Sequence, residues 1–260
     1  MDINKSKEVI KRYVEKYDVK NERIQGKIVH IQKVAENAKK IAEDLKLEKE
    51  DIQLAELIGL LHDIGRFEQL KRYNTYLDNK SVNHGELGVE ILFQDGLIKE
   101  IIEDRKYDEI IRKAIINHNR DSSKIDKNVS QRELLHIKII RDADKLDIYE
   151  ILTAGTLTTE AVYGKKDLSN EKFTEGLYEG FTKNKKVDYS KLETLFDQLI
   201  PHFLYIFDIN FKYSFKIIKE KEYIEKLYKR VENKVNEETK NKIKNIYSIC
   251  KEYIKNMNER

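Results

Sequence analysis

The chain has 260 residues, with 50 basic and 47 acidic side chains and a formal net charge of +3. This near balance argues against binding of nucleic acid through the overall field of the protein. One proline, ten glycines and a single cysteine, Cys250, exclude the collagen-like, linker-like and disulfide-scaffold classes. A chain of this length can bury one substantial hydrophobic core.

The amino-terminal sequence MDINKSKEVIKRYVEKY is charged rather than apolar, so we expect no secretory signal. No apolar run approaches the roughly 18 residues that a membrane span needs, so we expect no membrane partner. A lone cysteine cannot form an internal disulfide, which fits a reducing compartment. These features together predict a cytoplasmic protein.

Apolar residues recur at helical spacing along most of the chain, and clear strand alternation is absent. In chain order, the apolar stripes fall at residues 34–45, 54–61, 87–91, 111–115 and 135–146. From residue 188 onward the sequence predicts amphipathic helices rich in aromatic residues. We therefore expect an all-α bundle, with a main helical domain over residues 1–187 and C-terminal helices over 188–260 packed on it as one continuous domain.

Polar groups that chelate metals interrupt these stripes. Four of the six histidines lie on or beside core-facing positions, and Asp63 and Asp142 accompany them; the histidines are His30, His62, His84 and His118. A buried polar group costs several kcal/mol unless something satisfies it. A single histidine of this kind is more often a hydrogen-bonded core residue than a ligand. Four histidines and two aspartates from five helices, however, match the ligands of Zn, Fe, Mn, Co or Ni.

The order of these residues resembles the HD-domain superfamily of metal-dependent phosphohydrolases. The local sequences AELIGLLHDIGRFEQ, SVNHGELGVEIL, AIINHNRD and KIIRDADKLD carry the resemblance. It covers residues 26–150 strongly and extends more weakly through the aromatic C-terminal helices. It implies an HD-domain helical bundle with a helical C-terminal extension.

The resemblance also implies a ligand set. His30, His62, Asp63 and Asp142 would hold one metal ion. His84 and His118 match the additional histidines of the dinuclear subgroups, in which the aspartate at the position of Asp63 bridges the two ions. The implied cofactors are two divalent transition-metal ions from among Fe, Mn, Ni, Co and Zn, with Mg as a further candidate. In the alternative arrangement a single metal binds, and His84 and His118 line the substrate pocket.

The implied mechanism is attack of a metal-activated hydroxide on phosphorus. Asp63 would orient that water. Lys145, three residues after Asp142, and Arg66, four after His62, are the basic residues that we expect to act in catalysis and to bind phosphate. Arg120, two residues after His118, is a further substrate-binding candidate. The alternative for each is an ordinary basic residue on the surface.

The segment between Asp63 and His84 contains Lys71, Arg72, Tyr73, Asn74 and Tyr76. It is either a lid over a phosphate or base, or a solvated basic loop.

We expect a small phosphorylated substrate, with a nucleotide preferred, and a phosphatase, nucleotidase or phosphodiesterase reaction, including hydrolysis of dinucleotide polyphosphates. The signatures of the HD-GYP phosphodiesterases and the stringent-response hydrolases are absent, since the only proline is Pro201 and IGRFEQLKR follows the HD pair. Two alternatives share the ligand order: a di-iron oxygenase, and a module that senses a nucleotide without turnover. We expect no specific nucleic-acid partner. The aromatic residues of the C-terminal helices are compatible with two roles: a homodimer interface, or coverage of the core of the metal-binding domain.

Overall fold

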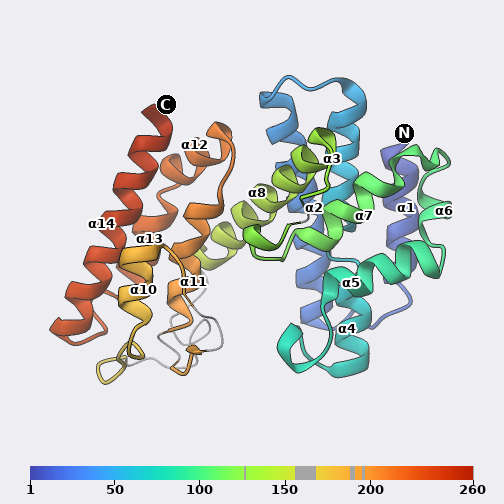
Figure 1. Ribbon diagram of the computed structural model, residues 1–260. Helices are drawn as coiled ribbons and strands as arrows, with labels where there is room; N and C mark the ends of the chain where they lie inside the picture. Colours follow the sequence, from blue (N-terminus) through green and yellow to red (C-terminus); the bar gives the residue numbers. More distant parts are fainter. Residues whose placement is uncertain (126, 156–167, 188–190, 195–196, 260) are drawn as a thin grey trace. The chain divides into compact units, whose positions relative to one another are not determined.

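A computed structural model describes residues 1–125, 127–155, 168–187, 191–194 and 197–259. These residues form helices joined by loops, with no strand among them, which confirms the all-α class (Figure 1). No helix in the described ranges is long and apolar enough to cross a membrane. The chain divides into two compact units, Met1–Asp147 and Ile148–Arg260.

The first unit carries the histidines. Its helices are α1 (Ile3–Val14), α2 (Glu22–Asp44), α3 (Lys49–Leu61), α4 (Gly65–Tyr73), α5 (His84–Val89), α6 (Ile98–Ile101), α7 (Asp108–Asn117) and most of α8 (Gln131–Thr153). Asparagine caps start two of them. The Asn21 side chain accepts from the backbone N–H of Arg23 at the start of α2, and the Asn83 side chain accepts from Gly85 and Glu86 at the start of α5.

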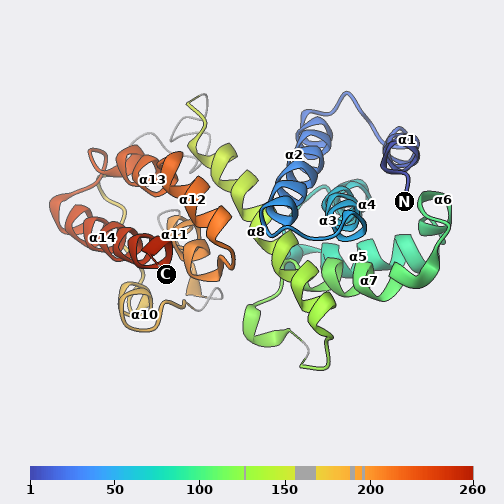
Figure 2. The ribbon, with the colours of Figure 1, turned by 90° about the horizontal axis from the view of Figure 1, so that it is seen from above.

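The central pair of this unit is α2 and α3, which lie side by side (Figure 2). The predicted stripes face each other there, because Val34, Ala38, Leu54 and Ile58 are at most 1% exposed. Gly59 allows the close approach, since a Cβ at this position would lie 2.5 Å from the Ala35 Cα. This pairing brings the end of α3, where His62 and Asp63 follow, against the helix that carries His30.

The second unit contains the aromatic helices. These are α10 (Leu177–Asn184), α11 (Leu199–Leu204), α12 (Lys212–Glu220), α13 (Tyr223–Val231) and α14 (Glu237–Glu259). Phe181, Phe203 and Phe215 are at most 1% exposed, so the aromatic residues of this segment build a core of their own. Cys250 lies in that core and is fully buried.

The division at Asp147–Ile148 falls inside α8 and therefore precedes the boundary that the sequence suggested between residues 187 and 188. The physical reason is that one continuous helix serves both units, and no Gly, Pro or polar linker marks the change. Residues 188–190 lie outside the described residues, and the assignment of 188–260 as a separate group of helices stays a prediction.

Candidate metal centre

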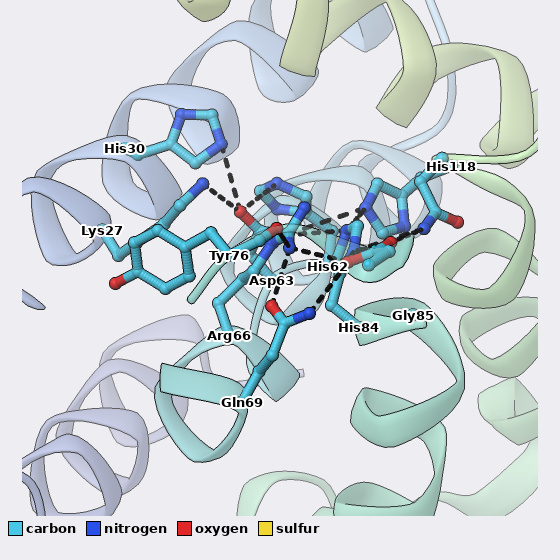
Figure 3. A network of polar contacts seen from close by, with 12 residues as sticks. Lys27, His30, His62, Asp63, Arg66, Gln69, Tyr76, His84, Gly85 and His118 are labelled. Atoms are coloured by element: carbon cyan, nitrogen blue, oxygen red, sulfur yellow. Dashed lines mark hydrogen bonds and ion pairs between the residues drawn. The ribbon is translucent and has the colours of Figure 1, made fainter. Parts of the chain in front are cut away.

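Four histidines and two aspartates converge inside the first unit. His30 comes from α2, His62 and Asp63 follow α3, and His84 begins α5; His118 caps the end of α7 and Asp144 comes from α8. The four histidines and Asp63 are at most 4% exposed. Figure 3 shows Asp63 in the middle, with His30 on one side and His84 and His118 on the other.

One group of donors surrounds the Oδ2 atom of Asp63. His30 Nε2 lies 3.4 Å from this oxygen, and His62 Nε2 lies 3.6 Å from it. Asp144 Oδ1 completes the group, at 3.2 Å from His30 Nε2 and 3.7 Å from His62 Nε2. His30, His62 and Asp144 are thus close enough to hold one metal ion together.

A second group surrounds the other oxygen of the same carboxylate. His84 Nε2 lies 3.3 Å from Asp63 Oδ1, and His118 Nε2 lies 3.8 Å from it. The two histidine Nε2 atoms are 2.9 Å apart. Asp63 therefore stands between two sets of nitrogen donors, with one carboxylate oxygen directed at each.

All four histidines are oriented in the same way by groups behind them. Their Nδ1 atoms lie within hydrogen-bonding distance of an oxygen: Asp147 Oδ2 for His30 (2.6 Å), the Gly59 carbonyl for His62 (2.8 Å), Asp78 Oδ2 for His84 (2.7 Å) and the Ile115 carbonyl for His118 (2.6 Å). Carbonyl and carboxylate oxygens accept, so each Nδ1–H donates and each Nε2 atom points inward. This is how protein groups prepare histidines as metal ligands.

The inward face of this arrangement fits a cation. His62 Nε2 is buried and has no hydrogen-bond partner in the described part of the chain. Burial, with the neighbouring His84 and His62, holds the pKa of His118 well below its usual value, and burial also lowers the pKa of His84. Two neutral rings would then direct lone pairs at each other across 2.9 Å. A metal ion satisfies such facing lone pairs, as it does the orphaned His62 nitrogen.

The carboxylates are held in their ionised form. Burial would raise the pKa of Asp63, but the Lys27 ammonium and the surrounding histidines lower it well below its usual value. For Asp144, burial is likewise outweighed by hydrogen bonds from His30 and His62. Burial lowers the pKa of His30, yet contacts with Asp144, Asp147 and Asp63 raise it to about 11.

The structure changes one candidate ligand, the aspartate of α8. The sequence suggested Asp142, but Asp144 is the α8 aspartate that reaches His30 and His62. Residues two apart on an α-helix point about 200° away from each other, so both cannot face the cluster. Asp142 is fully buried on a different side of α8. Asp144 therefore replaces Asp142 as the candidate for the last ligand position.

The three predicted basic residues have different surroundings. Arg66 reaches the cluster, with Nε 3.6 Å from Asp63 Oδ1 and Nη1 donating to Asp78 Oδ1 at 2.8 Å. Lys145 donates to the Arg141 carbonyl of its own helix at 3.2 Å. Arg120 instead pairs with Glu86 at 2.9 Å, on the surface. Of these three residues, Arg66 is the one whose described contacts include a cluster residue, Asp63.

Sequence reasoning missed the groups that support the ligands. Lys27 donates to Asp63 Oδ2 at 2.7 Å, and its position three residues before His30 on one helix is the signal that could have found it. Asp147 likewise lies one helical turn after Asp144. Asp78, which contacts His84 and Arg66, comes from a short 3-10 turn (Asp78–Lys80) with no periodic pattern to mark it.

Comparisons with known proteins agree with this geometry. The family model described as "HD domain" matches residues 28–149, the segment that contains every residue of the cluster. Comparison with curated proteins and with solved structures finds no match. This match supports a similarity to the HD superfamily over residues 28–149, which lie within the all-helical part of the chain described above.

Proposed function

We propose that this protein is a metal-dependent phosphohydrolase with a dinuclear centre, which hydrolyses a phosphate ester or anhydride of a small substrate, preferably a nucleotide. HD domains are in general metal-dependent hydrolases, and residues 28–149 match that family. The observation that carries the proposal is the position of Asp63, whose two carboxylate oxygens each face a pair of histidine Nε2 atoms.

The residues that would hold the metals follow from this arrangement. His30, His62 and Asp144 would hold one ion and His84 and His118 the other, with Asp63 shared between them. Nitrogen and carboxylate donors without thiolate suit Fe, Mn, Co, Ni or Zn. When bound, such ions would supply an activated water and neutralise the charge that develops on a phosphoryl group.

The chain's own residues would position the substrate. Arg66 Nε is buried and lacks a hydrogen-bond partner among the described residues, although Nη1 of the same guanidinium is anchored to Asp78. A fixed guanidinium whose Nε–H has no described acceptor is suited to bind a phosphoryl oxygen beside Asp63. Lys145 and Arg120 would have to leave the contacts described above, so we propose Arg66 as the phosphate-binding residue among the three.

The test combines metal content with turnover. We would measure metal-to-protein ratios and phosphate release from a nucleotide panel, without oxygen and with Mn²⁺ or Fe²⁺, for wild type, Asp63→Ala and His84→Ala. Asp63→Ala should lose both metals and activity, while His84→Ala should lose one metal. His136→Ala is a matched control, because His136 is buried and pairs with Asp51 away from the cluster.

Full activity in Asp63→Ala would overturn the mechanism. An unchanged metal ratio in His84→Ala would favour the single-metal arrangement. Oxygen consumption by the reduced iron form, without phosphate release, would favour a di-iron oxygenase. Nucleotide binding without turnover would favour a nucleotide-sensing module.

A further inference from the structure

One face of α2 presents a row of positive groups that leads to the metal centre. Arg23, Lys27 and His30 are spaced by four and three residues, so they lie on one side of the helix. Burial increases along the row. Arg23 is exposed, the Lys27 side chain is 22% exposed and the His30 side chain is 5% exposed. The row therefore runs from solvent to the cluster.

The ring of Tyr76 gathers these cations. Arg23 Cζ lies 5.0 Å from the ring centroid and Lys27 Nζ lies 5.6 Å from it, with Arg66 Cζ at 5.8 Å. All three distances are within the range of a cation–π contact. The Tyr76 hydroxyl also donates to the Arg23 carbonyl at 3.0 Å. Figure 3 shows the ring next to Lys27 and Arg66, beside Asp63.

Like charges repel, so this grouping needs negative charge nearby. Asp63 faces Lys27 and Arg66, and Asp78 pairs with Arg66. The hydrogen bonds of the Arg23 guanidinium go to neutral groups instead, the Asn74 carbonyl at 3.2 Å and the Asn74 side-chain oxygen at 3.1 Å. Both use Nη1, and within the described part of the chain no acceptor contacts Nη2 or Nε, so these donors can bind another acceptor.

We propose that Arg23 and Lys27, held by Tyr76, form a second anion subsite that binds a phosphate group joined to the one at the metal centre. The inference rests on the proposed function and narrows its substrate class to compounds with a phosphoanhydride. Along the helix axis, Lys27 lies about 4.5 Å and Arg23 about 10.5 Å from His30. Their long side chains converge on the Tyr76 ring, which brings both cations to the same side of the metal centre. There the Arg guanidinium can bind two oxygens, and the Lys ammonium can act as a point charge.

Lys27 provides a signature that separates this role from a structural one. Its ammonium lies 2.7 Å from Asp63 Oδ2, the oxygen that also faces His30 and His62. A cation at this oxygen opposes the binding of a metal ion there. Lys27→Met should therefore tighten metal binding and weaken binding of the anion, whereas a lysine that only paired with Asp63 would, on removal, tighten metal binding alone.

The experiment compares two stable probes on the Mn²⁺-loaded full chain. Methylenediphosphonate carries two linked phosphonates and methylphosphonate carries one. We would measure their dissociation constants by calorimetry for wild type, Arg23→Gln, Lys27→Met and the control Arg12→Gln, an exposed arginine of α1. Mn²⁺ bound to the protein would be measured for every variant at the end of each titration, so that loss of metal to the diphosphonate is separated from loss of the anion subsite.

Arg23→Gln should raise the dissociation constant of methylenediphosphonate about tenfold, because one charge-assisted hydrogen-bonding group is lost. It should change the dissociation constant of methylphosphonate less than twofold. Arg12→Gln should change neither. Equal effects on both probes, or none, would overturn the subsite. Tighter, Arg23-dependent binding of a short oligothymidylate would also overturn it, in favour of a phosphodiester chain. Because binding is measured apart from turnover, a protein without phosphohydrolase activity could still show the subsite, and an active one could lack it.

Discussion

His30 Nδ1 donates to Asp147 Oδ2 across 2.6 Å, which joins the middle of α2 to α8. The bond leaves His30 Nε2 directed at Asp63 and Asp144. Asp147 lies one turn after Asp144, so the same helix supplies a ligand and the group that orients another ligand. Such supporting carboxylates raise the basicity of a histidine and fix its ring.

We expect Asp147→Asn to lower metal affinity by about 10- to 100-fold with only a small loss of stability, because His30 would lose its orienting acceptor. Metal titration by calorimetry, together with thermal unfolding, checks this. Asp51→Asn is the matched control, since Asp51 contacts His136 at 2.8 Å outside the cluster and should leave metal affinity unchanged. Equal metal affinity in wild type and Asp147→Asn would contradict the positioning role.

The two aspartates of α8 give opposite expectations. Asp144→Asn should remove the metal held with His30 and His62, because Asp144 Oδ1 lies within 3.7 Å of both Nε2 atoms. Asp142→Asn should keep the metal content and cost stability alone, since Asp142 is fully buried and points to a different side of α8 from Asp144. Metal analysis of the two purified variants distinguishes them. Loss of metal from Asp142→Asn, with retention in Asp144→Asn, would restore the assignment made from the sequence.

Glycine packing around the HD pair leads to a third prediction. A Cβ at Gly65 would collide with the His84 carbonyl and come within 2.7 Å of the Gly88 backbone nitrogen. Gly65→Ala should therefore displace α5 and His84, with a cost of about 1–3 kcal/mol in unfolding free energy and loss of the second metal. Gly26→Ala on α2 is the control, because nothing lies within 4 Å of its added Cβ.

Gly26→Ala should instead stabilise the protein by up to about 1 kcal/mol, through helix propensity. Urea unfolding and metal ratios measure both variants. A Gly65→Ala protein that kept wild-type stability and two metals would show that α5 can shift without cost.

In the second unit, His202 predicts a dependence of stability on pH. Burial, with the charge of Arg230, lowers its pKa to about 4, whereas an unfolded histidine titrates near 6.5. The unfolded chain thus binds the extra proton first as pH falls, so this contribution to stability is lost between about pH 6.5 and 4. Between pH 7 and 4.5, the free energy of unfolding should therefore fall by roughly 2–3 kcal/mol less in His202→Gln than in wild type. Urea unfolding at the two pH values tests this, and identical losses would contradict it.

Much of the fold and site followed from local patterns. Periodic apolar residues predicted helices where α2, α3, α7 and α8 form, and the core positions 34, 38, 54 and 58 are buried as expected. The His62–Asp63 pair and the other three histidines were found because polar groups on apolar stripes stand out. The second unit shows the limit of that reasoning, since a helix shared by both units carries no break in sequence.

The choice between Asp142 and Asp144 required the tertiary structure. Helix α8 is buried on several sides, with Ile137, Ile140, Ala143 and Leu146 all at most 3% exposed, so its hydrophobic periodicity does not identify one inward face. The roles of Lys27, Asp78 and Tyr76 depend in the same way on distances between segments far apart in the chain. Sequence determines which side chains are available and which local elements they join. The packing of those elements determines which charges meet, because electrostatic and hydrogen-bonding energies depend on separation in space.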